Sequence, residues 1–280
     1  MNIRELIGCR PAVGAVGIEI ELEADNIPPP SHTDLYWRKE ADASLRGESA
    51  EYVMKKPANI DKLDTIFGEL TRAFDNSGLK MRPTYRAGIH VHVNVQDLTP
   101  TQLITFVSSY FLLEEVLLSF CDKSRVGNHF CLRMKDASYL LDPLVSFIET
   151  QDINVLNDDN LRYSSLNVTS LFKYGSIEFR ALESTLDFNR IKIWAGVLAH
   201  LKEYATTVQN PVELLGQASE LGFTEFAPVI LGPWYVHFKQ WCTEENLHQG
   251  VRNIQYAIYS RNWTSKNLNI FKGKNIFSAP

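Results

Sequence analysis

Apolar and polar residues alternate along three segments of the chain, which is the pattern expected of β-strands with two different faces. Residues 17–25 read GIEIELEAD, with a glutamate at every second position and an isoleucine or leucine between them. Residues 87–95, AGIHVHVNV, and residues 175–182, GSIEFRAL, alternate in the same way. Because successive side chains point to opposite faces of a strand, each segment predicts one apolar face and one ionisable face.

The rest of the chain predicts further strands and several helices. The first strand is expected to cover residues 13–24, and others fall within 34–42, 50–57 and 161–168. The clearest helix begins after Thr99, because a capping threonine is followed by Pro100 and by the capping-box partner Gln102. Helices are also predicted at 59–77, from residue 187 onward, at 212–221 and at 229–246, whereas 121–160 predicts mixed loop and short helix.

The order of these elements favours an α+β domain with a largely antiparallel sheet and a helical C-terminal part, because strands and helices do not alternate regularly. The three consecutive prolines at 28–30 place a loop after the first strand. No glycine-rich phosphate loop is present, since GAVG at 14–17 lacks the lysine and the spacing of that motif.

Composition and charge narrow the class of protein. The 280 residues are 45% hydrophobic and 22% charged, and the net charge of -5 is spread without basic runs, so we expect no nucleic-acid partner. The four cysteines form no CxxC pair, which favours a reducing cytosol over a disulfide framework. No apolar run approaches the roughly 20 residues of a membrane span. The sequence therefore predicts a cytoplasmic protein without a membrane partner.

The ionisable faces are the candidate chemistry. Carboxylates two residues apart on one face repel one another unless a cation neutralises them. Oxygen ligands predominate, which favours Mg²⁺ or Mn²⁺ over zinc, although a His-x-His strand also occurs in zinc sites. The alternative for any single strand is a solvated polar face. The residues on these faces are Glu19, Glu21, Glu23, His90, His92, Asn94, Glu178 and Arg180.

Five segments in a fixed order resemble a known family. They are GIEIE at 17–21, DASLRGESAEYVMKKP at 42–57, AGIHVHVNV at 87–95, RYSSLN at 162–167 and GSIEFRALESTLD at 175–187. Neither G-x-E-x-E nor H-x-H is specific alone, but the ordered set resembles the amidoligase family, carboxylate-amine ligases of the glutamine synthetase-like superfamily. The resemblance covers about residues 15–190.

This resemblance implies a fold and an activity. The fold would be a curved, mostly antiparallel sheet of the glutamine synthetase-like catalytic type over residues 1–208, with packing helices and a helical C-terminal extension over 209–280. The activity would be ATP-dependent ligation of a carboxylate to an amine through an acyl phosphate. The substrates would be an amino acid, a peptide or a cell-wall fragment, and a homo-oligomer stays open. The alternatives are a metal-dependent hydrolase and a non-catalytic metal-binding relative.

The resemblance also implies a metal site. Asp42 matches an acidic motif position, with a turn-capping role as the alternative. Glu23 lies outside the motif and is expected to be a solvated flank. Of the two histidines, either could bind metal or nucleotide, and His92 is preferred as the metal ligand over His90. The implied ligands of Mg²⁺ or Mn²⁺ are Glu19, Glu21, Glu51, His92 and Glu178.

The remaining implied residues bind nucleotide and substrate. Arg180 would hold phosphate oxygens, and His90 and His92 would contribute to the nucleotide site. Asn167 and Arg162 match positions used near the nucleotide or substrate. Aromatic residues of the C-terminal part, including Trp234, Tyr235, Trp241 and Trp263, are expected to pack in the core, with a substrate pocket as the alternative.

Overall fold

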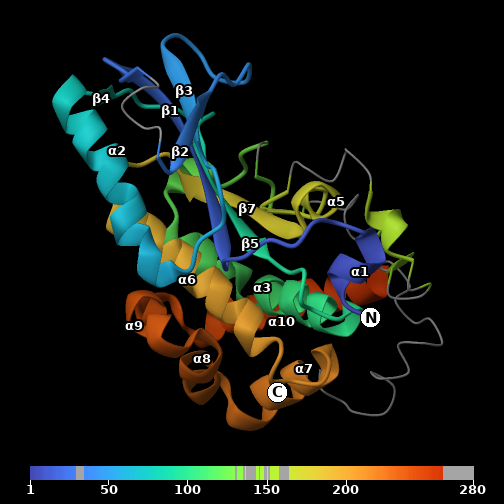
Figure 1. Cartoon of the computed structure of the whole chain (residues 1–280). Helices are drawn as coiled ribbons and strands as arrows, with labels where there is room; N and C mark the ends of the chain where they lie inside the picture. The colour runs from blue at the N-terminus through green and yellow to red at the C-terminus, as the bar shows by residue number, and fades with distance from the viewer. Residues whose placement is uncertain are drawn as a thin grey trace.

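The computed structural model describes residues 1–29, 35–129, 131–134, 136, 143–144, 146–147, 150, 152–157 and 164–260, with side chains described as far as residue 254. Within these residues a mixed architecture of helices and one open antiparallel sheet is observed (Figure 1). The α+β prediction is therefore confirmed at this level. The division at residues 208 and 209 stays a prediction.

In the described residues the sheet has seven strands, and all the pairings between them are antiparallel. Six strands follow the order β2-β3-β1-β5-β7-β6, and β4 pairs with the end of β1. The strand bounds are β1 Val16–Asp25, β2 Trp37–Glu40, β3 Ser49–Met54, β4 Lys80–Met81, β5 Gly88–Asn94, β6 Leu166–Asn167 and β7 Ser176–Glu183.

The register of the central strands sorts their side chains onto two faces. Ile18 pairs with Val91, and Val91 pairs with Phe179, so these buried apolar residues share the core face. Glu19 pairs with His90 on the opposite face. Antiparallel partners point to the same side of a sheet, so the alternation seen in the sequence becomes one continuous ionisable face.

Helices cover the core face. Figure 1 shows α2, α3 and α6 on one side of the strands, with α7 to α10 forming a further layer against α3 and α6. The α-helix bounds are α1 Ile3–Ile7, α2 Leu63–Ser77, α3 Pro100–Phe120, α5 Ser170–Tyr174, α6 Phe188–Tyr204, α7 Pro211–Leu221, α8 Phe223–Leu231, α9 Tyr235–Phe238 and α10 Glu244–Ser260. The 3-10 helices are η2 Ile60–Lys62, η3 Lys123–Arg125, η4 Ile153–Leu156, η6 Gly232–Trp234 and η7 Lys239–Trp241.

Helix α3 begins where the sequence predicts. The Thr99 side chain accepts a hydrogen bond from the Gln102 amide, and the Gln102 side chain accepts one from the Thr99 amide. By length and composition alone, this 21-residue helix could cross a membrane. However, 72% of its most apolar window is buried inside the protein, so core packing explains its composition.

Two sequence predictions differ from the structure in identifiable ways. Of the strand predicted within 161–168, the structure describes residues 164–168, where β6 comprises Leu166 and Asn167 paired with β7. The single helix predicted at 229–246 is broken, because Gly232 has a positive φ of 51° and Pro233 follows it. A separate helix, α10, packs along α3 and was missed, as were the short elements α1, β4 and α5.

The C-terminal aromatics that fall within the described residues pack as predicted. Trp234, Tyr235 and Trp241 are partly buried against the hydrophobic core. The Trp241 ring meets the Phe120 ring edge-on at 6.1 Å between centroids. Trp263 lies outside the described residues.

Candidate functional site

Five strands contribute to the ionisable face of the sheet. Of the nine predicted site residues, eight lie on this face, and Arg162 lies outside the described residues. Their roles stay predictions, but their positions are clear. The eight are Glu19 and Glu21 on β1, Glu51 on β3, His90 and His92 on β5, Asn167 on β6, and Glu178 and Arg180 on β7.

His90 lies at the centre of the carboxylates. Its Nδ1 is 3.3 Å from Oε2 of Glu19 and 3.3 Å from Oε1 of Glu178, and its Nε2 is 3.6 Å from Oε1 of Glu21. The residue is only 3% exposed. It therefore lies within ion-pair range of carboxylates on both neighbouring strands.

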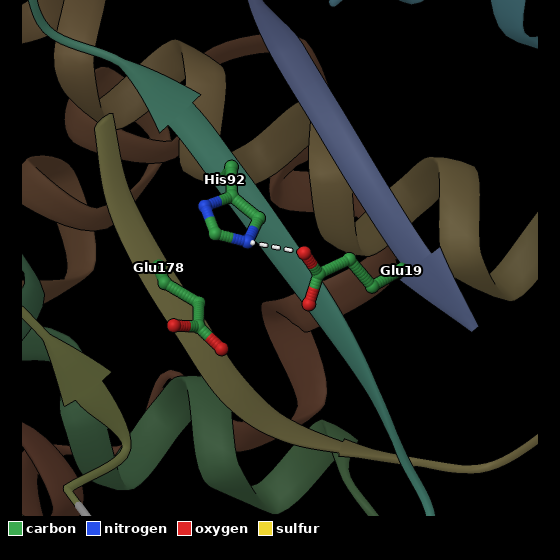
Figure 2. Close-up of side chains that lie close together, drawn as sticks. All are labelled: Glu19, His92 and Glu178. Carbon is green, nitrogen blue, oxygen red and sulfur yellow. Dashed lines mark ion pairs between the residues drawn. The ribbon is translucent and has the colours of Figure 1, made fainter. Parts of the chain in front are cut away.

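His92 forms a second contact between the same strands. Figure 2 shows its ring between Glu19 and Glu178, with Nε2 at 3.2 Å from Oε1 of Glu19. That nitrogen is buried and lacks a partner in hydrogen-bond geometry, while Nδ1 lies 3.1 Å from Oγ of Ser176. Ligand atoms of Glu19, His92 and Glu178 lie within 4.8 Å of one another. The three residues could therefore hold one ion together.

The carboxylate of Glu178 is held from two sides. Its Oε1 accepts a 2.5 Å hydrogen bond from Nη1 of Arg180, and its Oε2 accepts a 2.6 Å hydrogen bond from the Asn167 amide. Burial alone would raise the pKa of Glu178, but the charges of Arg180, His90 and His92 lower it. This carboxylate is therefore ionised and fixed in orientation.

Two of these carboxylates show opposite pKa shifts. Burial would raise the pKa of Glu19, but hydrogen bonds and charges from both histidines hold it well below its usual range. Burial and the charges of Glu19 and Glu21 raise the pKa of Glu51 to about 8. Glu51 therefore holds a proton at neutral pH, and a cation bound beside it would compete with that proton.

A second group of oxygen ligands lies beside the first. Ligand atoms of Glu21, Asp42 and Glu51 lie within 4.8 Å of one another, as do those of Glu19, Glu51 and His90. Asp42 also accepts a 2.6 Å hydrogen bond from the Ser44 amide, so it caps a turn as well. The two roles weighed for Asp42 are structurally compatible.

Glu23 is not the solvated flank that the sequence suggested. It is 8% exposed, and its Oε1 accepts a 2.8 Å hydrogen bond from the Arg46 amide. Pairing of β1 with β3, together with the loop before β3, covers a side chain that the alternating pattern alone leaves open.

The sequence does not predict a role for Arg125, which supports the pairing of two strands of the site. The pairing of β5 with β7 shifts register between Ile89 and Val91, so two β7 residues stand opposite one β5 residue. The buried guanidinium of Arg125 donates to the carbonyls of Arg180 and Ala181 at this bulge, at 2.7 and 3.3 Å. No sequence pattern marks it, because its partners are main-chain atoms 55 and 56 residues away.

The donor set on this face fits a hard divalent cation. Carboxylate oxygens predominate, joined by imidazole nitrogen, and no cysteine contributes. Nε2 of His92, buried beside Oε1 of Glu19 and close to Glu178, is placed to serve as the nitrogen ligand. Mg²⁺ or Mn²⁺ therefore fits the residues present.

Two cavities lie along the face, one at each end of β1. The first, about 160 Å³, is bounded by Gly17, Glu19, His92 and Tyr174 and by an apolar wall from β3 and the following loop. The second, about 560 Å³, begins at Glu23 and extends over the segments around residues 83–86 and 124–129. Residues 17 and 23, which lie beside the two cavities, are about 20 Å apart along β1.

Comparisons with known proteins give a matching family and similar solved structures. A search of curated proteins returned no match. A bifunctional glutathione synthetase from Pasteurella multocida, solved by crystallography, is similar with a TM-score of 0.40 and 11% identity. The similarity covers 89% of this chain and 52% of that chain, so this chain spans about half the length of that protein.

The family comparison covers more than half of the chain. The family described as "Putative amidoligase enzyme" matches residues 53–201, a range that includes His90, His92, Asn167, Glu178 and Arg180. Glu19, Glu21 and Glu51 precede the matched range but lie against it in the sheet. The resemblance inferred from the five sequence segments is thereby confirmed, and the chain belongs to the amidoligase family.

Proposed function

We propose that this protein is an ATP-dependent carboxylate-amine ligase that forms an amide or isopeptide bond through an acyl phosphate, with Mg²⁺ or Mn²⁺ as cofactor. The observation that carries the proposal is the convergence of buried carboxylates and histidines on one sheet face in a member of the amidoligase family. The sheet would be the glutamine synthetase-like platform. The acid is an amino acid, a peptide or a cell-wall fragment.

The reaction proceeds in two steps. A carboxylate oxygen of the acid attacks the γ-phosphorus of ATP, the bond to the bridging oxygen breaks, and ADP leaves with the electron pair. The amine nitrogen then attacks the acyl carbon, inorganic phosphate leaves, and the proton of the amine is released to solvent. Phosphoryl transfer of this kind is catalysed mainly by positioning and by neutralising charge.

The residues of the face serve positioning and neutralisation. Glu19, His92 and Glu178 form one candidate metal position, and Glu21, Asp42 and Glu51 form another. A divalent cation bound there would neutralise phosphate oxygens. Arg180, fixed beside Glu178, presents a guanidinium that suits a phosphate in the same region.

The smaller cavity suits the purine base. It is bounded by Val53, Met54 and Pro57 on one side and by the exposed ring of Tyr174, and it touches the candidate metal ligands Glu19 and His92. A nucleotide whose base contacts Tyr174 would then have its phosphates close to Glu19 and His92. Stacking of a base on an aromatic ring is worth about 1–3 kcal/mol.

A trapping assay tests the ligase proposal without knowledge of the natural amine. Hydroxylamine converts an acyl phosphate into a hydroxamate, so a panel of carboxylic acids is incubated with ATP, Mg²⁺ and hydroxylamine. We expect hydroxamate and phosphate in equal amounts with at least one acid, and loss of both in Glu19→Gln. Glu220→Gln, on an exposed position of α7, is the control that should keep activity.

Two results would contradict the proposal. Phosphate release without hydroxamate would favour a metal-dependent hydrolase. Equal activity of wild type and Glu19→Gln would remove Glu19 from the site.

A further inference from the structure

Arg180 stands in a β-bulge, where the pairing of β5 with β7 is interrupted. On β5, Ile89 and Val91 are two residues apart, whereas their partners on β7, Leu182 and Phe179, are three residues apart. The extra residue of a bulge leaves main-chain groups that the neighbouring strand does not pair, and it changes the direction of a side chain. The orientation of the Arg180 guanidinium therefore depends on the groups that hold this bulge.

Two groups from outside β5 hold the main chain on either side of the Arg180 Cα. The amide of Arg180 donates to the carbonyl of Ser165 at 2.9 Å, and the carbonyl of Arg180 accepts from Nη2 of Arg125 at 2.7 Å. Nε of Arg125 also donates to the next carbonyl, that of Ala181, at 3.3 Å. Because both peptide groups that flank the Cα are held, φ and ψ of Arg180 are restrained, and the direction of its side chain is restrained with them.

The guanidinium of Arg125 is itself held from both strands. Its Nη1 donates to the Ala87 carbonyl, just before β5, at 3.4 Å, so one side chain spans the two strands of the bulge. Gly88 allows this approach, because a Cβ there would lie 2.9 Å from Nη2 of Arg125. The start of η3, which carries Arg125, is joined to the end of β7, since the Asp122 amide donates to Oε2 of Glu183 at 2.8 Å.

Arg125 lies behind the site and not in it. The residue is 5% exposed, and its side chain lines neither of the two cavities along the face. In the described part of the chain, its guanidinium donates to the three carbonyls of the bulge. Burying a cation costs free energy unless such groups compensate it. An apolar side chain could fill the same space, but it would leave these carbonyls without their donors.

We propose that Arg125 is a positioning residue of the ligase, which aims the guanidinium of Arg180 at the transferred phosphate by holding the bulge. This inference rests on the ligase proposal, in which Arg180 binds phosphate. Glu178 contacts the far end of the Arg180 side chain at 2.5 Å, whereas Arg125 holds its main chain. A cationic group stabilises a phosphate best when its orientation is set before the ligand arrives. Loss of Arg125 should therefore weaken phosphate binding although no group that touches the phosphate is removed.

A double-mutant cycle tests whether Arg125 acts through Arg180. The measurement is the calorimetric affinity for the Mg²⁺ complex of a non-hydrolysable ATP analogue. Arg180→Gln should weaken binding about tenfold or more, because a charged hydrogen bond is lost. Arg125→Met should weaken it about tenfold, the usual range for a group that orients a ligand-binding residue. In the Arg180→Gln background, Arg125→Met should add less than about twofold, because effects that share one route are not additive.

Two further variants and a metal titration separate positioning from loss of the fold. Arg125→Lys keeps the charge but offers one ammonium in place of the planar fork, so an intermediate loss of about threefold is expected. Arg190→Met is the matched control, because Arg190 contacts Glu183 at the end of β7 and the Phe120 carbonyl instead of the bulge. It should change nucleotide affinity less than about twofold.

Mn²⁺ binding without nucleotide reports on the rest of the site. It is followed by electron paramagnetic resonance and should not weaken by more than about twofold in Arg125→Met, because the three carbonyls that Arg125 holds belong to residues outside the candidate metal ligands. Loss of Mn²⁺ binding in both Arg125→Met and Arg125→Lys would show that Arg125 only maintains the fold, which would overturn the inference.

The remaining outcomes separate this inference from the ligase proposal. Additive losses in the double variant, or wild-type affinity in either Arg125→Met or Arg180→Gln, would show that Arg125 does not act through Arg180, although the ligase proposal would stand. Absence of Mg²⁺-nucleotide binding by the wild-type protein would contradict the ligase proposal and this inference together.

Discussion

The two faces of the central strands bury opposite kinds of side chain. Phe179 is fully buried on one face, and its neighbour Glu178 is 5% exposed on the other. The first contacts the rings of Phe106 and Tyr110, whereas the second contacts Arg180 and Asn167. Burial of apolar atoms stabilises a fold, while burial of like charges opposes it. This difference is the one expected of a polar face that binds a ligand at a cost in folding stability.

Substitutions at two neighbouring residues of β7 should show the largest difference in folding stability between the two faces. Phe179→Ala removes a buried ring and should lower the free energy of unfolding by about 3–5 kcal/mol. Glu178→Gln is isosteric and keeps an oxygen for the Asn167 amide but loses the charged hydrogen bond from Arg180, so a smaller loss of about 1.5–3 kcal/mol is expected. Urea unfolding without divalent cations measures both. An equal loss of stability in the two variants would contradict the division of roles.

A buried carboxyl on the core side should make the folding stability depend on pH, which extends the comparison of the two faces. Glu114 on α3 is fully buried and accepts hydrogen bonds from the Met134 amide and the Ser165 hydroxyl. Burial raises the pKa of Glu114 to about 7. The folded state therefore binds more protons than the unfolded state between pH 4.5 and 7, so stability falls as pH rises through this window.

The size of this effect follows from the shift in pKa. Each pKa unit corresponds to about 1.4 kcal/mol, so this one group should cost about 3 kcal/mol by pH 8. Urea unfolding of wild type and Glu114→Gln at pH 5, 6, 7 and 8 isolates the contribution, because other titrating groups cancel in the difference. A difference that does not vary with pH would show that Glu114 has an ordinary pKa.

The smallest expected effect is a change in nucleotide affinity that differs between the two ends of the polar face. Tyr174 and Tyr85 are both exposed tyrosines, one at each cavity. Tyr174→Ala should weaken binding of a non-hydrolysable ATP analogue about tenfold through lost stacking, and Tyr174→Phe should restore it. Tyr85→Ala is the matched control and should change nucleotide affinity less than about twofold. The reverse ranking, read by calorimetry, would place the nucleotide at the Glu23 end.

Local patterns predict the central strands and α3 well because their signals are short-range. Alternation fixes the faces of β1, β5 and β7, and the Thr99 capping box fixes the start of α3. The sequence does not predict helix α10, because the helix predicted at 229–246 runs across the break at Gly232 and overlaps the start of α10. The fold beyond these elements depends on packing between distant segments.

The candidate site divides in the same way. Glu19, His92 and Glu178 could be named because each stands in a strand whose alternation is visible. Arg125 could not, because it donates to carbonyls of a bulge that exists only after β5 and β7 pair. The burial of Glu23 likewise follows from the loop before β3. Sequence therefore predicts which ionisable groups gather on one face better than it predicts which groups position them.

The most direct test of the central claim is calorimetric titration of the protein with a non-hydrolysable ATP analogue, with and without Mg²⁺. The account predicts binding that requires Mg²⁺ and that weakens by about a hundredfold or more in Glu19→Gln, since a metal ligand is lost. Glu220→Gln should bind like wild type. Absence of nucleotide binding with Mg²⁺ or Mn²⁺, or unchanged binding in Glu19→Gln, would contradict the claim that the polar face holds metal against nucleotide phosphates.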